Sequence, residues 1–276
     1  MTDVLTGALV FLVGASIGSF LNVCIARWPA ELSVVTPRSR CPKCERPVRW
    51  HENLPIASWL LLRGRCRGCR EAISPQYLVV ELLVALGWLA AMLAFGPSFT
   101  ALRVAVFGTV LAGIAITDAR HYLIPDGFTV FGLLWTLATA VAALLLGEPS
   151  ALFASPADAF LGACAGAGLV SIVGWLGEVA LKKEAMGFGD VTLMAVVGAA
   201  VGPWRALLTV FVGAALAAVI FLLVVYPIAW VRGRRRGTPF EPPLVPFGVF
   251  LAPAAFLTLL WGNDLIAWYL GYLSPP

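Results

Sequence analysis

Two aspartates lie where a long apolar segment meets polar residues. Asp118 follows Thr117 at the end of one apolar run, and Asp190 ends a Gly-Phe-Gly-Asp tract in which Gly187 and Gly189 allow close approach of the backbone. A carboxylate at a membrane boundary is costly to place, so each is a candidate functional group. Two of them on one side of a membrane would form a paired acid/base site.

The chemistry available to such a pair follows from charge repulsion. Two carboxylates that share a site cannot both ionise easily, so one of them keeps a proton. The ionised carboxylate can activate water while the protonated one polarises a carbonyl group, which is the logic of aspartic proteases. We therefore interpret Asp118 and Asp190 as a catalytic dyad.

Each acid also has a structural interpretation. Asp118 fits a helix-end carboxylate that pairs with Arg120 or caps a turn, and Asp190 fits an N-cap. Asp126 follows an Ile-Pro turn, and we predict that it caps the fourth apolar span. Glu81, about one turn inside the second span, is a further buried acid to which physical reasoning assigns no role.

Four of the six cysteines form two C-x-x-C pairs. Cys41 and Cys44 make the first pair, and Cys66 and Cys69 follow after 21 intervening residues. Two such turns can complete a tetrahedral site of four sulfurs, for which zinc is the usual metal. Structural disulfides are rare in the reducing cytosol. The spacing predicts a structural zinc site, because four protein ligands leave no open position for catalysis.

Composition determines the class of protein. The chain is 60% hydrophobic and 12% charged, with a mean hydropathy of +0.90, which excludes an ordinary soluble domain. Apolar runs near the roughly 20 residues needed to cross a bilayer should be helices, because lipid offers the backbone no hydrogen-bond partners. We predict an all-α polytopic membrane protein with about eight transmembrane helices. The predicted spans are 4–26, 77–96, 100–117, 127–147, 158–180, 187–203, 206–230 and 246–270.

The distribution of basic residues predicts the orientation. Residues 27–76 carry ten Lys and Arg, and such residues accumulate in cytoplasmic loops. With that loop inside, 17 of the 19 Lys and Arg are cytoplasmic, and only Arg103 and Arg205 lie outside. Both termini then face outward, and Asp118 and Asp190 lie at cytoplasmic ends. This topology accounts for the net charge of +4, so no nucleic-acid partner is expected.

Small residues four positions apart predict close helix packing. They occur as Gly14 with Gly18, Gly162 with Gly166, and Gly198 with Gly202. The first apolar run lacks the positive start of a signal peptide, so we expect a retained helix.

Several tracts, in order along nearly the whole chain, resemble the type IV prepilin leader peptidases with N-methyltransferase activity. The matching tracts are Gly18 to Val23 with Arg27 and Pro29, Ser39 to Cys44, Asn53 to Pro55, Ser58 to Leu60, Cys66 to Cys69, Thr117-Asp118 with Ile124 to Asp126, Gly187 to Asp190, and Pro246 to Gly248. The chain departs from the family pattern at Thr192, where lysine is usual, so no charge contact is expected from that position.

The resemblance implies a GxGD-type membrane aspartic peptidase of the bacterial inner membrane. Asp118 and Asp190 would cleave the basic leader of a type IV prepilin or a type II secretion pseudopilin at the cytoplasmic face. The new amino terminus would then be methylated from S-adenosylmethionine. The implied divisions are a first transmembrane helix at 1–26, a cytoplasmic four-cysteine zinc-binding domain at 27–76 and a transmembrane peptidase domain at 77–276.

Two other functions share some of these features. A GxGD protease of another substrate class, without methyl transfer, would keep the dyad, although the cysteine domain argues against it. A proton-coupled transporter would place acids near the bilayer midplane and often has repeated halves. Neither feature is evident in the sequence.

Overall fold

The computed structural model describes residues 2–182, 186–236 and 245–273. The chain divides into two compact units, Met1–Gly113 and Ile114–Pro276, which are described separately. Lys183, one of the basic residues predicted to be cytoplasmic, lies outside the described residues.

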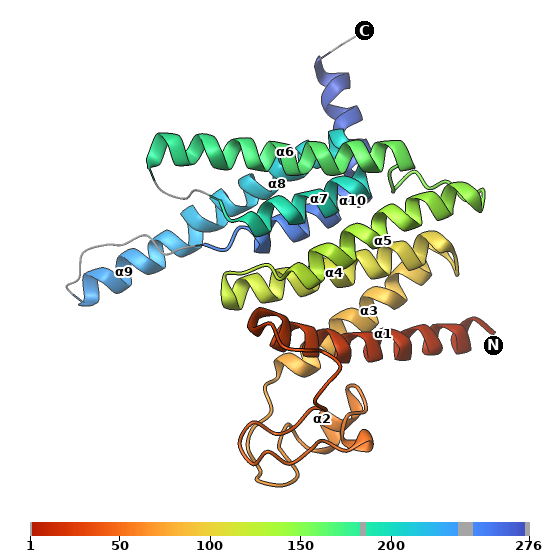
Figure 1. The fold of residues 1–276 in the computed structure, drawn as a ribbon, viewed down its shortest axis with the longest axis vertical. Coiled ribbons are helices and arrows are strands. Elements are labelled where there is room, and N and C mark those ends of the chain that lie inside the picture. The colour runs from red at the N-terminus through yellow and green to blue at the C-terminus, as the bar shows by residue number, and fades with distance from the viewer. Residues whose placement is uncertain (1, 183–185, 237–244, 274–276) are drawn as a thin grey trace. The chain divides into compact units, whose positions relative to one another are not determined.

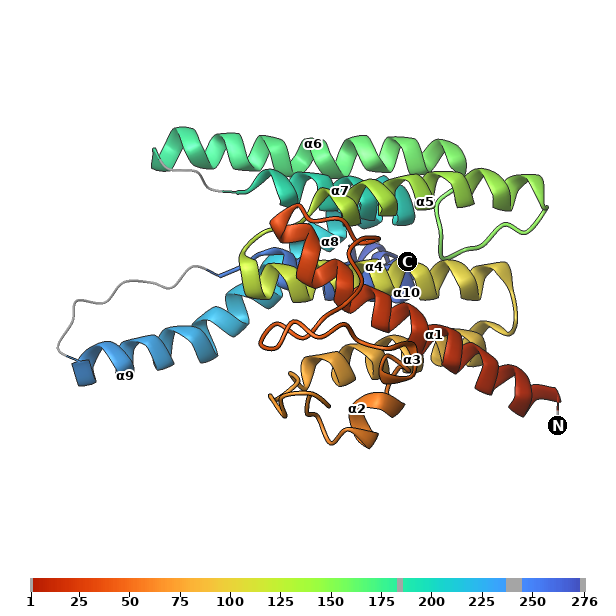
Figure 2. The same ribbon diagram turned by 60° about the horizontal axis from the view of Figure 1, so that its bottom comes forward.

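The first unit is built on two packed apolar helices, α1 (Thr2–Arg27) and α3 (Gln76–Phe95). Figure 2 shows them packed together. Gly14 and Gly18 provide the contact surface on α1: a Cβ at Gly18 would lie 2.8 Å from the Glu81 Cα. The predicted role of these small residues in packing is confirmed. The segment between α1 and α3 contains only short helices, which are η1 (Trp28–Ala30), η2 (Trp50–Glu52) and α2 (Ala57–Leu61).

The second unit is also helical. The helix α4 (Phe99–His121) begins in the first unit and ends in the second. The remaining helices are α5 (Asp126–Leu145), α6 (Pro156–Leu181), α7 (Phe188–Val201), α8 (Pro203–Ile220), the π-helical segment η3 (Phe221–Val225), α9 (Tyr226–Arg236) and α10 (Gly248–Leu273).

Seven helices in the described residues are long and apolar enough to cross a membrane. The sixth predicted span, 187–203, forms the shorter apolar helix α7 of 14 residues. At 1.5 Å per residue, α7 rises about 21 Å, which is less than the roughly 30 Å hydrocarbon thickness. The seventh predicted span, 206–230, is longer than expected. In the structure it runs continuously from Pro203 to Arg232.

Protein groups satisfy the backbone where the short helix α7 ends. The Ala154 N–H donates to the Ala200 carbonyl oxygen at 2.9 Å. Arg205 donates through Nε to the Val201 carbonyl at 2.7 Å and through Nη1 to the Leu152 carbonyl at 2.7 Å. Carbonyl groups at a helix end need partners when water is excluded. The loop before α6 and the buried Arg205 supply these partners.

Close backbone contact holds α7 against α6, and the two helices run side by side in Figure 1. A Cβ at Gly162 would lie 2.1 Å from the Gly198 carbonyl oxygen, and one at Gly166 would lie 2.2 Å from the Met194 carbonyl oxygen. Real Cβ atoms essentially never come within 3.0 Å of such an atom. These glycines therefore set the separation of the two helices, as the sequence predicted.

Candidate functional site

The first candidate acid, Asp118, lies in the last turn of α4, in the second unit. Tyr122 adopts a positive φ of 53° directly after the helix, and its N–H donates to the Asp118 carbonyl oxygen at 2.9 Å. The Asp118 side chain is buried, with 5% of its surface exposed. Asp118 takes part in none of the ion pairs among the described residues, so the alternative pairing with Arg120 is wrong.

The second candidate acid, Asp190, occupies the first turn of α7. The N-cap of that helix is Gly187, and the Asp190 N–H donates to the Gly187 carbonyl oxygen at 3.1 Å. The alternative role of Asp190 as the N-cap is therefore wrong. Its carboxylate interacts with the Gly187 N–H instead, as an acid in the first turn of a helix commonly does.

Ile124 links the surroundings of the two aspartates. A Cβ at Gly248, which would lie 2.8 Å from the Asp118 Oδ2, would also lie 2.9 Å from the Ile124 Cδ1. Ile124, from the turn after α4, packs against the start of α7, where a Cβ at Gly189 would lie 2.9 Å from the Ile124 Cβ. Gly189 therefore allows the close backbone approach that the sequence predicted. Gly187 does not show such an approach, because a Cβ there would meet only the Asp190 carboxylate, at 3.9 Å. The Gly-Phe-Gly-Asp tract brings its aspartate to Asp118 because the second glycine admits Ile124.

Asp126 and Thr192 have simpler structural roles. Asp126 is the first residue of α5 and is exposed, and Pro125 is the N-cap. Because Pro125 and not Asp126 occupies the N-cap position, the predicted cap at Asp126 is wrong. Thr192 donates to the Gly189 carbonyl oxygen at 3.0 Å within its own helix and brings no charge to the site.

The four cysteines form two equivalent turns in the first unit. The Cys41 N–H donates to the Arg46 carbonyl oxygen at 3.0 Å, and the Cys66 N–H donates to the Glu71 carbonyl oxygen at 2.8 Å. In each turn the residue after the second cysteine has a positive φ, 54° at Glu45 and 60° at Arg70. Isolated bridges close both turns: Arg40 with Pro47, and Arg65 with Ala72.

The sulfur atoms of these turns converge on one point, as predicted. The Sγ atoms of Cys41 and Cys69 are 3.7 Å apart, and those of Cys44 and Cys66 are 4.0 Å apart. All four lie within 4.8 Å of one another. Tetrahedral zinc with Zn–S distances of about 2.3 Å separates its sulfur ligands by about 3.8 Å. The four side chains fit a metal site of this size.

The acidity of the thiols also fits a metal site. The backbone N–H groups of Cys44 and Lys43 lower the pKa of the Cys41 thiol to about 6. The Glu71 N–H lowers the pKa of Cys69, but desolvation and the neighbouring cysteines outweigh it and raise that pKa to about 11. Without a cation the cluster therefore holds fewer than four thiolates. A divalent metal would supply the compensating charge.

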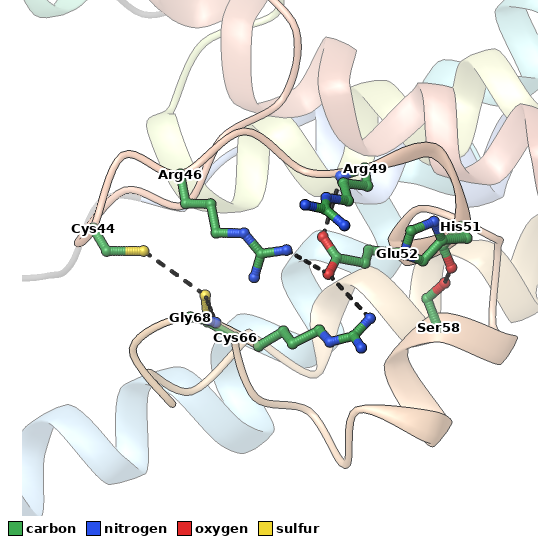
Figure 3. Close-up of polar contacts among 9 residues, drawn as sticks. Cys44, Arg46, Arg49, His51, Glu52, Ser58, Cys66 and Gly68 are labelled. Carbon is green, nitrogen blue, oxygen red and sulfur yellow. Dashed lines mark hydrogen bonds and ion pairs between the residues drawn. The ribbon is translucent and has the colours of Figure 1, made fainter.

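Glu52 links the two cysteine turns, as Figure 3 shows. Its Oε1 accepts from the Arg46 guanidinium at 2.7 Å and lies 3.6 Å from the Arg67 guanidinium. Its Oε2 accepts from the Arg49 N–H at 3.2 Å. The Arg49 N–H and these two arginines lower the pKa of the Glu52 carboxyl. One carboxylate thus fixes the first turn relative to the second.

Glu81, which the sequence left without a role, joins this loop to a membrane helix. Its carboxylate is buried in α3 and accepts from the Ile56 N–H at 2.6 Å. Ile56 has a φ of 62°, an unfavourable value for a β-branched residue. Asn22 of α1 donates to the Tyr77 carbonyl oxygen at 3.1 Å nearby on α3. Glu81 therefore anchors the loop at the α1–α3 pair.

Comparison with known proteins supports the sequence resemblance. Residues 12–95 match the bacterial peptidase A24 N-terminal domain, and residues 105–223 match the type IV leader peptidase family. No solved structure matches the chain.

Three curated relatives illustrate the similarity. The prepilin leader peptidase/N-methyltransferase of Aeromonas hydrophila is 36% identical over 95% of this chain and 93% of its own length. The protein of the same description from Pseudomonas aeruginosa is 34% identical over 95% and 92%. The type 4 prepilin-like proteins leader peptide-processing enzyme of Escherichia coli is 38% identical over 69% and 75%. These matches confirm the resemblance, and the chain belongs to the type IV leader peptidase family of bacterial multi-pass membrane proteins.

Proposed function

We propose that this protein is a prepilin leader peptidase and N-methyltransferase whose peptidase dyad is Asp118 and Asp190. The observation that carries the dyad is the packing of Ile124, which meets Gly189 beside Asp190 in the first turn of α7 and also meets Gly248, against which the buried Asp118 carboxylate lies. One carboxylate activates a water molecule, and the other donates a proton to the scissile carbonyl oxygen. The close approach at Gly189 supports this arrangement.

The predicted topology suits a pilin precursor as the substrate. The basic loop that holds the four cysteines is cytoplasmic by the distribution of Lys and Arg. The same argument assigns the Asp118 and Asp190 ends of their helices to the cytoplasmic face of the bacterial inner membrane, with both chain termini outside. A prepilin or pseudopilin keeps a charged leader in the cytosol and an apolar helix in the bilayer. Its scissile bond would then lie at the depth of the dyad.

We assign methyl transfer to the cytoplasmic side of the same protein, with S-adenosylmethionine as the donor. Cys41, Cys44, Cys66 and Cys69 would hold one structural zinc ion, which would stabilise the fold of the loop and leave no open position for chemistry. A charged donor needs a pocket that faces water. The segment between α1 and α3 is the long loop that carries this metal site, and Glu81 fixes it to the membrane helices.

Incubation of the purified protein with a prepilin, with and without S-adenosylmethionine, tests both activities. Mass spectrometry should show leader loss in both reactions, and a further mass increase of one methyl group only with the donor. A prepilin that stays intact would refute the peptidase assignment. Cleavage without methylation would support a GxGD protease that lacks methyl transfer.

A further inference from the structure

The first residue of α10 lies directly against Asp118. A Cβ at Gly248 would lie 2.8 Å from the Asp118 Oδ2 and 3.3 Å from its Cγ. Any side chain at position 248 would therefore occupy space that the carboxylate now fills. Both residues belong to the second unit, and 130 positions of sequence separate them.

The start of α10 also faces the carboxylate with N–H groups. The N–H groups of Gly248 and Val249 open α10 beside the Asp118 carboxylate, and the first N–H groups of a helix have no partner within the helix. These groups and the helix dipole stabilise a negative charge. Within the described part of the chain, the Asp118 Oδ2 is buried and has no hydrogen-bond partner. This oxygen is available to accept a proton from a bound water molecule.

Ile124, in the turn after α4, meets the starts of both α7 and α10. A Cβ at Gly248 would lie 2.9 Å from the Ile124 Cδ1, and a Cβ at Gly189 would lie 2.9 Å from the Ile124 Cβ. Ile124 therefore fixes the start of α10 relative to the helix that carries Asp190. The two aspartates differ in their surroundings: the start of a second helix, α10, lies against Asp118, whereas Asp190 lies in the first turn of its own helix α7.

From this geometry we propose that Gly248 is a positioning residue, and that the start of α10 makes Asp118 the carboxylate that activates water. The inference rests on the proposed peptidase function. The proton of the attacking water passes to Asp118 as its oxygen bonds to the scissile carbonyl carbon, and Asp190 protonates the carbonyl oxygen. When the C–N bond breaks, Asp118 returns its proton to the leaving amine and Asp190 recovers its own. No other reactant is needed.

Gly248→Ala tests the inference through the rate and the Michaelis constant of leader cleavage. We expect kcat to fall about 100-fold, the typical cost of displacing a catalytic group by about 1 Å, with little change in KM. Gly271→Ala is the matched control on the same helix, because no described atom lies within 4 Å of a Cβ placed there. Normal kcat in Gly248→Ala, with an active wild type, would overturn this inference and leave the peptidase function intact. An inactive wild type would overturn both.

Two double variants separate positioning from packing. Ile124→Val removes the Cδ1 that a Cβ at position 248 would meet but leaves the contact with Asp118. If the contact with Ile124 caused the loss of kcat in Gly248→Ala, adding Ile124→Val would restore kcat. We expect kcat to stay low in this double variant. Conversely, Asp118→Ala removes the clashing oxygen. The destabilisation by Gly248→Ala, measured by thermal unfolding, should be smaller in that background, and an equal destabilisation would refute the contact.

Discussion

A single methyl group added to α6 should separate the two helices that place Asp190. A Cβ at Gly166 would lie 2.2 Å from the Met194 carbonyl oxygen, and real Cβ atoms essentially never lie within 3.0 Å of such an atom. Gly166→Ala therefore requires a shift of about 0.8 Å. The obstructing atom belongs to the backbone, so no side-chain rotation relieves the contact. We expect a destabilisation near the upper end of the 1–3 kcal/mol typical of overpacking.

The same shift should reach the proposed active site. Met194 lies about one turn after Asp190 on α7, so a displacement of that turn moves the carboxylate relative to Asp118. Misplacement by about 1 Å can cost about 100-fold in rate. Thermal unfolding in detergent and the initial rate of prepilin cleavage measure the two effects.

Gly168→Ala provides the matched control two residues along the same helix. No described atom lies within 4 Å of a Cβ placed at Gly168. Alanine is also the better helix former, by about 0.5–1 kcal/mol. This variant should be as stable as the wild type or slightly more stable, with normal cleavage. If Gly166→Ala and Gly168→Ala unfold and cleave alike, the close packing of α6 and α7 does not position the site.

Variants at three further places test the cysteine cluster, Glu81 and Asp126. Replacing Cys41 and Cys66 together by serine should release about one zinc per chain, measured by elemental analysis, whereas Cys164→Ser should keep the metal. The double variant should also lose more methylation than cleavage. Equal loss of the two activities would contradict a separate role of the loop in methyl transfer. Glu81→Leu leaves the Ile56 N–H unpaired and should cost about 1–3 kcal/mol in thermal unfolding, whereas Glu81→Gln keeps an acceptor and should cost less. Asp126→Asn should retain most leader cleavage in the prepilin assay, because that side chain is exposed and Asp126 is not the N-cap of α5.

The sequence was sufficient for features that depend on local pattern. Hydropathy predicted the helical spans because the bilayer imposes a length and a composition on each of them. The spacing of Cys41, Cys44, Cys66 and Cys69 predicted the sulfur cluster because each pair lies in one tight turn. Helix ends were less accurate. The seventeen-residue run at 187–203 forms only 14 helical residues, because Gly187 and Gly202 cap the helix at its two ends.

Contacts between distant segments could not be predicted in the same way. Nothing in the local pattern shows that Gly248 meets Asp118, or that Ile124 packs against both Gly189 and Gly248. The late Pro-Phe-Gly tract, 246–248, was evident only as a family resemblance. Such a resemblance marks a position in the sequence but does not show which residue it contacts. Glu81 was visible as an acid in an apolar span, but its partner is a backbone N–H that sequence patterns do not mark.

Two variants, Asp118→Asn and Asp190→Asn, test the proposed dyad most directly. Each is purified and compared with the wild type for leader cleavage of one prepilin by mass spectrometry. An amide cannot reproduce a pair with one ionised and one protonated carboxylate. We predict that each variant inserts and unfolds like the wild type yet leaves the prepilin intact. Near-normal leader removal by either variant would contradict the assignment of these two aspartates as the peptidase dyad.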